Sequence, residues 1–165
     1  MSASGNGHRR FARPDDELRR LTTLVQLSRD SEAAASEHDL LASALTTVAG
    51  ILPGHAIAIA LVDDSGVEIP ERFVRGRMPI ELATLVAAVS LDRGELVERS
   101  EDDSTVLGWP LAGSRGPIGA LVARAPRTGI TDADRAMLQA MSQQLSLTLD
   151  NLRLRRQLNR LLFRD

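Results

Sequence analysis

Hydrophobic positions recur at helical spacing in the first third of the chain. Leu18, Leu21 and Val25 fall within residues 15–35, and a second stripe of apolar residues follows in residues 36–52. Ser36 and Asp39 have the spacing of a capping box, in which each residue satisfies an amide at the start of a helix. The pattern therefore predicts two helices before any strand, with Pro53-Gly54 ending the second.

The spacing of apolar residues then changes to that of strands. His55 to Val62 is apolar without alternation, which predicts a central strand covered on both faces. Asp63 to Gly66 is a turn, and Val67 to Val74 is its partner strand. Pro70 interrupts this second strand, because proline cannot donate to a sheet hydrogen bond, and so predicts an edge or a bulge.

Five further elements are expected before the last helix. Residues 79–91 have the pattern of a short amphipathic helix, and 113–116 that of a turn between two strands. The stretch at 118–125 is apolar on both faces and predicts a second central strand. The other strand candidates are the short Glu95 to Glu98 and Thr105 to Leu111, which contains Trp109.

The last helical pattern runs from Thr131 to Leu162. At about 1.5 Å per residue such a helix spans more than about 45 Å, which is longer than a small domain. One apolar stripe along it has the spacing of a face that packs on a sheet. That stripe consists of Leu138, Met141, Leu145, Leu149 and Leu152.

A second stripe of the same helix alternates by three and four residues, as in a coiled coil. It consists of Met137, Ala140, Gln144, Leu147, Asn151, Leu154, Leu158 and Leu161. Asn151 falls at an a position, where an asparagine fixes register and favours a parallel dimer. Asp150 and Arg155 then take g and e positions and meet with opposite charge across that dimer.

The first helix offers apolar residues that could complete this dimer interface. Leu18, Leu21 and Val25 would add a second pair of helices beside the seam, giving a four-helix contact. The alternative is that Leu154 to Leu162 folds back on the first helix of the same chain. We expect the homodimer, because the asparagine and the charge pattern both agree with the seam.

Composition narrows the classes of function. The chain has 165 residues, a net charge of -2 and 43% hydrophobic residues, which indicate one folded domain with no bulk attraction to nucleic acid or to an anionic membrane. It has no cysteine and no lysine, so thiolate, Schiff-base and Walker-type phosphate chemistry are excluded. No apolar run approaches the roughly 20 residues of a membrane helix. We expect a cytoplasmic protein whose residues 1–14 form a disordered tail.

Candidate catalytic and metal-binding residues are few. Of the three histidines, His8 falls in the tail, His38 in the first turn of a helix, and His55 at the start of the central strand, where it could border a pocket. Acidic residues gather at Glu98 and at 101–103 without the spacing of a calcium loop. We therefore expect no enzymatic activity, no catalytic residue, no metal site and no cofactor.

Three stretches, in their order along the chain, resemble the GAF domain family. They are Leu40 to Gly66, the pair Gly108 to Leu111 and Gly116 to Leu121, and Ile130 to Asp134 at the start of the last helix. The resemblance implies an α+β fold: an antiparallel sheet of five or six strands, with the terminal helices on one face and a short connector on the other. It places the domain at residues 15–155, with 156–165 as the end of a C-terminal signalling helix.

Members of that family bind cyclic nucleotides, tetrapyrroles or small metabolites, or bind nothing and dimerise. This sequence lacks the cysteines that bilin attachment and the family's methionine sulfoxide reductases require, and its connector at 76–104 is short for the roof of a pocket. We expect a regulatory module that homodimerises and has a small or vestigial ligand pocket. It would act on a downstream partner protein or on an output domain outside this sequence. The alternatives are a scaffold that docks signalling or transcription partners, and a small-molecule sensor. The sensor's pocket would be lined by Ile57, Ile59, Met78, Leu82, Val86 and Trp109.

Overall fold

The computed structural model describes residues 18–21 and 37–162. Residues 18–21 are helical, in agreement with the first expected helix. The tail at 1–14, the remainder of that first helix with Val25, and the Ser36 cap lie outside the described residues.

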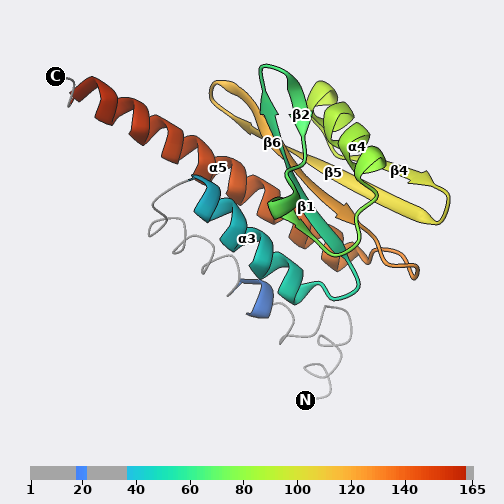
Figure 1. Ribbon diagram of the computed structural model, residues 1–165. Helices are drawn as coiled ribbons and strands as arrows, with labels where there is room; N and C mark the ends of the chain where they lie inside the picture. Colours follow the sequence, from blue (N-terminus) through green and yellow to red (C-terminus); the bar gives the residue numbers. More distant parts are fainter. Residues whose placement is uncertain (1–17, 22–36, 163–165) are drawn as a thin grey trace, which may run out of the picture.

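The described part of the chain forms a six-stranded antiparallel sheet (Figure 1). Its strands run in the order β2-β1-β6-β5-β4, and β3 also pairs with β1. The two strands predicted to be central, β1 and β6, lie next to each other in the middle, which confirms the interpretation of their unbroken apolar runs. The bounds are β1 Ala56–Asp63, β2 Gly66–Glu68, β3 Val74–Arg75, β4 Val97–Glu101, β5 Ser104–Gly113 and β6 Gly116–Arg124.

The interruption expected at Pro70 divides one predicted strand into two. β2 ends at Glu68, and a short 3-10 helix at Glu71–Phe73 precedes β3. Both pieces pair antiparallel with β1, at Leu61–Asp63 for β2 and at Ile57–Ala58 for β3. The proline thus breaks the edge of the sheet without removing either piece from it.

Helices cover both faces of the sheet. α3 (Glu37–Ile51) and α5 (Asp132–Leu162) lie on one face, and α4 (Ile80–Arg93) lies on the other (Figure 1). The amide of Asp134 donates to the hydroxyl of Thr131 at 3.1 Å, which caps the start of α5. This arrangement confirms the expected fold class, with α4, in the connector between β3 and β4, on the second face.

The two faces of the sheet differ in the size of their side chains. Alternate residues of a strand point to opposite faces, so each central strand contributes to two separate cores. On the face of α3 and α5 the strands present large residues, including Ile57, Ile59, Leu107, Trp109 and Leu121. On the face of α4 they present small ones, including Ala58, Ala60 and Ala120. The main core is therefore on the side of α3 and α5, and α4 packs on a shallower surface.

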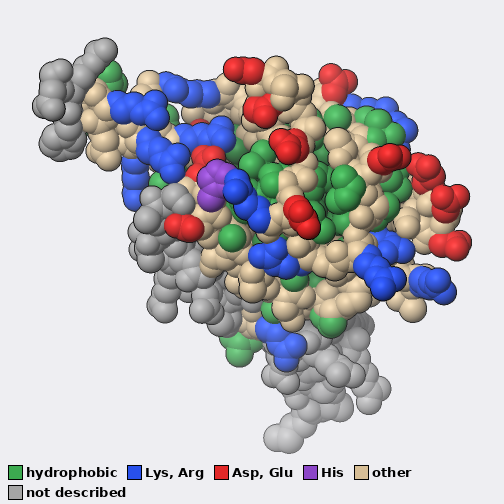
Figure 2. All heavy atoms as spheres, viewed as in Figure 1, with side chains coloured by type: hydrophobic (Ala, Val, Ile, Leu, Met, Phe, Trp, Pro, Cys, Tyr) green, Lys and Arg blue, Asp and Glu red, His purple; other side chains and the backbone are tan. Residues whose placement is uncertain are grey.

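Charged side chains of both signs surround the hydrophobic ones on the molecular surface (Figure 2). Figure 2 also shows arginine side chains gathered at the end where α5 projects past the sheet. No helix in the described ranges is long and apolar enough to cross a bilayer.

Candidate functional site

The core-facing side of α5 follows the first of the two predicted stripes. Leu138, Met141, Leu145 and Leu149 are at most 1% exposed, and Leu152 packs against the same core. Met137, predicted to begin the coiled-coil seam, is instead buried in this core with 5% exposure. The reason is that the sheet still lies beneath this part of α5, so the seam can begin only further along the helix.

The opposite side of α5 carries leucines that the described residues leave largely or partly exposed. Leu147 is 63% exposed, Leu158 55% and Leu161 61%, while Leu154 is 37% exposed. Asn151 lies among them and is exposed as well. Large apolar side chains at regular spacing on the solvent side of a helix are expected where another helix packs. We call Leu147, Asn151, Leu154, Leu158 and Leu161 the leucine stripe.

The described turn of the first helix has a similar apolar surface. Leu18 is 64% exposed and Leu21 60%. Between them, Arg20 forms an ion pair of 3.2 Å with Asp134 in the first turn of α5. This contact places the turn beside the start of α5, whereas the leucine stripe lies in the second half of that helix.

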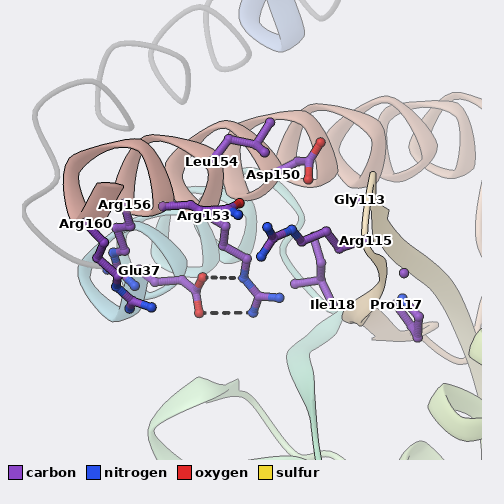
Figure 3. Close-up of a pocket in the computed structure, with 12 residues that line it drawn as sticks. Glu37, Gly113, Arg115, Pro117, Ile118, Asp150, Arg153, Leu154, Arg156 and Arg160 are labelled. Atoms are coloured by element: carbon purple, nitrogen blue, oxygen red, sulfur yellow. Dashed lines mark hydrogen bonds and ion pairs between the residues drawn. The ribbon is translucent and has the colours of Figure 1, made fainter. Parts of the chain in front are cut away.

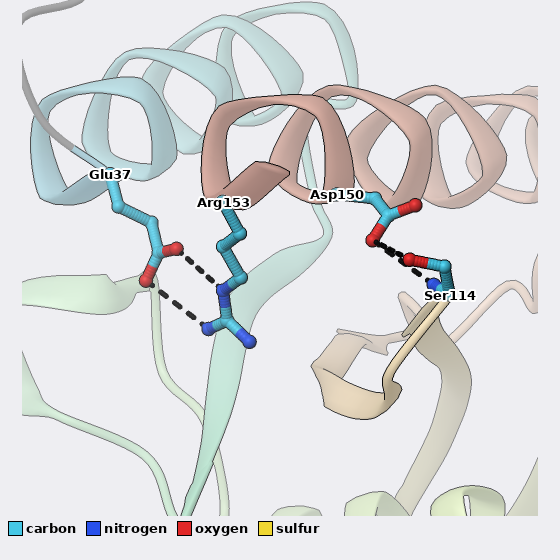
Figure 4. A network of polar contacts seen from close by, with 4 residues as sticks. All are labelled: Glu37, Ser114, Asp150 and Arg153. Carbon is cyan, nitrogen blue, oxygen red and sulfur yellow. Dashed lines mark hydrogen bonds and ion pairs between the residues drawn. The ribbon is translucent and has the colours of Figure 1, made fainter. Parts of the chain in front are cut away.

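Two polar contacts hold the second half of α5 against the rest of the domain (Figure 4, Figure 3). The guanidinium of Arg153 donates to both carboxylate oxygens of Glu37 on α3, at 2.8 and 3.3 Å. The amide and the hydroxyl of Ser114, in the β5–β6 turn, each donate to Oδ1 of Asp150 at 3.0 Å. The hydrogen bond to Glu37 raises the pKa of the Arg153 guanidinium above its usual value, because it favours the charged form of the arginine.

The contact of Asp150 with Ser114 is one that sequence reasoning missed. Asp150 was predicted to meet Arg155 of a second copy, whereas here its Oδ1 accepts hydrogen bonds from the same chain. The β5–β6 turn packs closely against Asp150, because a Cβ at Gly113 would lie 2.5 Å from its Oδ1. Arg155 is exposed, and the pair across a dimer stays a prediction.

A cleft of about 410 Å³ lies beneath the part of α5 that extends past the sheet. Figure 3 shows its residues coming from α3, from the β5–β6 turn and from α5. Four arginines and two carboxylates line it: Arg115, Arg153, Arg156, Arg160, Glu37 and Asp150. Sequence reasoning did not identify this cleft, because Arg115 lies far along the chain from the other arginines.

The six residues predicted to line a ligand pocket do not line one pocket. Ile57, Ile59 and Trp109 point into the core beneath α3 and α5. Leu82 and Val86 are buried in the core beneath α4, with Met78 packed against it. The sheet separates the two groups, because the direction of alternate residues along a strand cannot be fixed from an unbroken apolar run.

The face beneath α4 is closely packed. A Cβ at Gly108 of β5 would lie 2.8 Å from Cγ1 of Val86, so the helix approaches the strand where a side chain is missing. A groove of about 840 Å³ remains beside the start of α4. Its apolar lining consists of Ile69, Val74, Met78 and Ile80, and its charged lining of Glu71, Arg77 and Arg124. Of the six predicted pocket residues only Met78 lines this groove.

The described histidines have different surroundings. The ring of His38 lies 2.8 Å from the guanidinium of Arg72 and stacks on Phe73 with centroids 5.7 Å apart. His55 borders a hollow of about 370 Å³, and neither of its ring nitrogens has a hydrogen-bond partner among the described residues. His8 lies outside the described residues.

The acidic cluster at 98–103 does not form a metal site within the described chain, where no group of three His, Asp or Glu side chains could hold an ion. Glu98 instead pairs with Arg135 of α5 at 2.9 Å. Through Glu98 the acidic segment thus contributes a surface contact between β4 and α5.

Comparison with solved structures identifies the fold. The chain is similar to a predicted GAF sensor protein from Burkholderia vietnamiensis, with a TM-score of 0.70, 13% identity and coverage of 88% of this chain and 97% of that one. The GAF domain of an Acinetobacter phosphoenolpyruvate-protein phosphotransferase gives a TM-score of 0.62 and 20% identity, covering 82% and 95%.

An enzyme is also among the similar structures. A free methionine-R-sulfoxide reductase from Thermoplasma acidophilum gives a TM-score of 0.54 and 11% identity, covering 67% of this chain and 90% of that one. Neither a protein-family model nor a curated protein matches the sequence. Identities this low establish the fold alone, and the chain has a GAF-like fold.

Proposed function

We propose that this GAF-like chain is a non-enzymatic regulatory module that homodimerises through the second half of α5. The observation that carries the proposal is the leucine stripe, which is exposed on the side of α5 facing away from the sheet. Leu147, Leu154 and Leu161 recur every seven residues, with Asn151 between the first two. A seven-residue repeat of leucines is the pattern by which two parallel helices pack along a seam.

A second copy of the chain fits this stripe better than an unrelated partner does. Asn151 is satisfied within an apolar seam when it meets the same asparagine of an identical helix. Burial of a leucine side chain contributes about 1.5–3 kcal/mol, so the repeated leucines of two copies supply enough free energy for association. The stripe is short, and we expect the exposed Leu18 and Leu21, beside the start of α5, to add a second contact to the dimer.

The attachment of α5 to the domain supports a regulatory role for such a dimer. The pairs Glu37–Arg153 and Ser114–Asp150 fix the helix to α3 and to the β5–β6 turn immediately beside the leucine stripe. A displacement of the sheet would therefore move the stripe with it, and α5 would carry the change to an output domain or a partner protein.

The absence of cysteine supports a non-enzymatic role. The free methionine-R-sulfoxide reductase that shares this fold belongs to a class of enzyme that we expect to need catalytic cysteines. This chain has no cysteine, so it cannot carry out that thiol chemistry. His55, the histidine nearest a hollow, has no hydrogen-bonded partner among the described residues that would orient it as a general base.

Replacing Asn151 with leucine tests the seam. We expect Asn151→Leu to give a more stable assembly with mixed oligomeric states, because the buried amide that selects the parallel dimer is lost. Asn159→Leu is the matched control, since Asn159 is also exposed on α5 but falls outside the leucine stripe. Native mass spectrometry and thermal melting compare the two. An Asn151→Leu protein with the mass distribution and melting temperature of the control would contradict the seam.

A second candidate function is supported by the groove beside α4. Its volume of about 840 Å³ suits a small metabolite, and its two arginines, Arg77 and Arg124, outnumber its one carboxylate, Glu71, which favours an anionic one. We expect such a ligand to shift the methyl resonances of Ile69 and Ile80 in NMR spectra while leaving that of Ile57, in the opposite core, unchanged. A metabolite panel that moves none of these resonances argues against a sensor. Trp109 is unsuitable as a reporter, because it is buried beneath α3 and α5.

A further inference from the structure

The side of α5 that faces the domain changes from apolar to basic where the helix passes the edge of the sheet. Up to Leu152 this side presents apolar residues to the core. Arg153, Arg156 and Arg160 follow at spacings of three and four, which keep them on one side of the helix. The apolar stripe is thus continued by arginines, which line the cleft of about 410 Å³ beneath the overhang.

A fourth arginine enters the cleft from the β5–β6 turn. Figure 3 shows Arg115 directed toward the guanidinium of Arg153 across the opening. The turn that carries it has a fixed position, because Ser114 is hydrogen-bonded to Asp150 and Gly113 packs against the same carboxylate. Arginines from two elements that are distant in sequence therefore converge on one cleft.

Three of these arginines have no carboxylate partner among the described residues. Arg153 is paired with Glu37, and Asp150 is engaged by Ser114. Arg115, Arg156 and Arg160 form no ion pair or hydrogen bond within the described chain and are exposed. Grouping like charges is unfavourable unless an anion neutralises them, and guanidinium groups bind phosphate oxygens in a bidentate geometry.

We propose that this cleft binds a small oligophosphate, either inorganic or as part of a nucleotide. An anion with two or more phosphates can bind guanidinium groups on both sides of the cleft, whereas a single carboxylate could bind only one of these groups. The volume is that of a small-molecule site and is too small for a folded partner. Ile118, Pro117 and Leu154 provide an apolar surface beside the arginines. The arginines of the site all come from one chain and lie outside the leucine stripe, whose Leu154 borders the cleft.

Binding of inorganic tripolyphosphate, measured by isothermal titration calorimetry at low ionic strength, tests the proposal. We expect saturable binding of one ligand per chain. Arg156→Gln/Arg160→Gln should weaken it by about tenfold or more, since charge-assisted hydrogen bonds to phosphate are lost. Arg115→Gln, on a different element, should weaken it in the same direction. Circular dichroism verifies that each variant is folded.

The matched control removes the same charge from the other end of the molecule. Arg93 and Arg99 are exposed and lie outside the cleft, so Arg93→Gln/Arg99→Gln should change the affinity by less than about twofold. Equal losses in the two double variants would show an unspecific charge effect and overturn the proposal, as would the absence of saturable binding.

Further ligands distinguish the source of the phosphate. A nucleoside triphosphate that binds as tightly as tripolyphosphate, with no binding of the free nucleoside, supports recognition of the phosphate chain. Binding of the nucleoside alone would contradict it. An acidic peptide of glutamates that binds in the cleft while tripolyphosphate does not would also overturn it, in favour of a protein partner.

Discussion

Replacing both Leu147 and Leu154 with glutamate is expected to convert the proposed dimer into a folded monomer. The two residues are 63% and 37% exposed in the single chain and belong to neither of its two cores, so the fold should tolerate both charges. In a dimer the same positions face each other across the seam, where carboxylates would be buried without partners. Each lost leucine burial removes about 1.5–3 kcal/mol, so the dimer dissociation constant should rise by at least about a thousandfold.

The matched control for this variant places the same charges on α4. Ile80 and Leu85 are 44% and 45% exposed, and they lie on the opposite face of the sheet from α5. Ile80→Glu/Leu85→Glu should leave the dimer intact in sedimentation equilibrium. If both double variants retained the dimer, α5 would not be the interface, and if both became monomers, the effect would not be specific to the leucine stripe.

Substitution of Gly119 by alanine is expected to destabilise the whole fold. Gly119 lies in β6 opposite Leu61 of β1, in the centre of the sheet. An added Cβ would overlap the backbone carbonyl oxygen of Ala60, so the two central strands would have to move apart. Overpacking of this kind costs typically 1–3 kcal/mol, and we expect a loss of about 3 kcal/mol because the obstacle is backbone.

Gly50 provides the matched control for Gly119→Ala. It lies near the end of α3, where a Cβ would meet nothing within 4 Å. Gly50→Ala should leave the free energy of unfolding unchanged or raise it by up to about 1 kcal/mol, because alanine favours the helix. Urea unfolding, monitored by the fluorescence of the buried Trp109, measures both changes. Equal stability of the two variants would contradict the close approach of β1 and β6.

The order of elements could be predicted from the sequence because each has its own spacing of apolar residues. The unbroken run at 56–62 and that at 118–123 belong to central strands with both faces covered, as expected. The same unbroken runs explain why the residues of a pocket could not be predicted. An unbroken run does not reveal which residues face which core, so Ile57 and Leu82 were assigned to one pocket although the sheet separates them.

The candidate sites were predictable to different degrees. The leucine stripe follows from local spacing on one helix, and the exposure of Leu158 and Leu161 agrees with that interpretation. The arginine cleft could not be predicted, because it depends on how the β5–β6 turn sits against α5. The contact between Asp150 and Ser114 that fixes this arrangement joins residues 36 positions apart.

Native mass spectrometry of the unmodified protein is the most direct test of the central claim, that identical chains associate through α5. We expect a predominant species with twice the mass of the 17.9 kDa chain at micromolar concentration. That species should disappear in Leu147→Glu/Leu154→Glu and persist in Ile80→Glu/Leu85→Glu. A monomer at every accessible concentration of the unmodified protein would contradict the account.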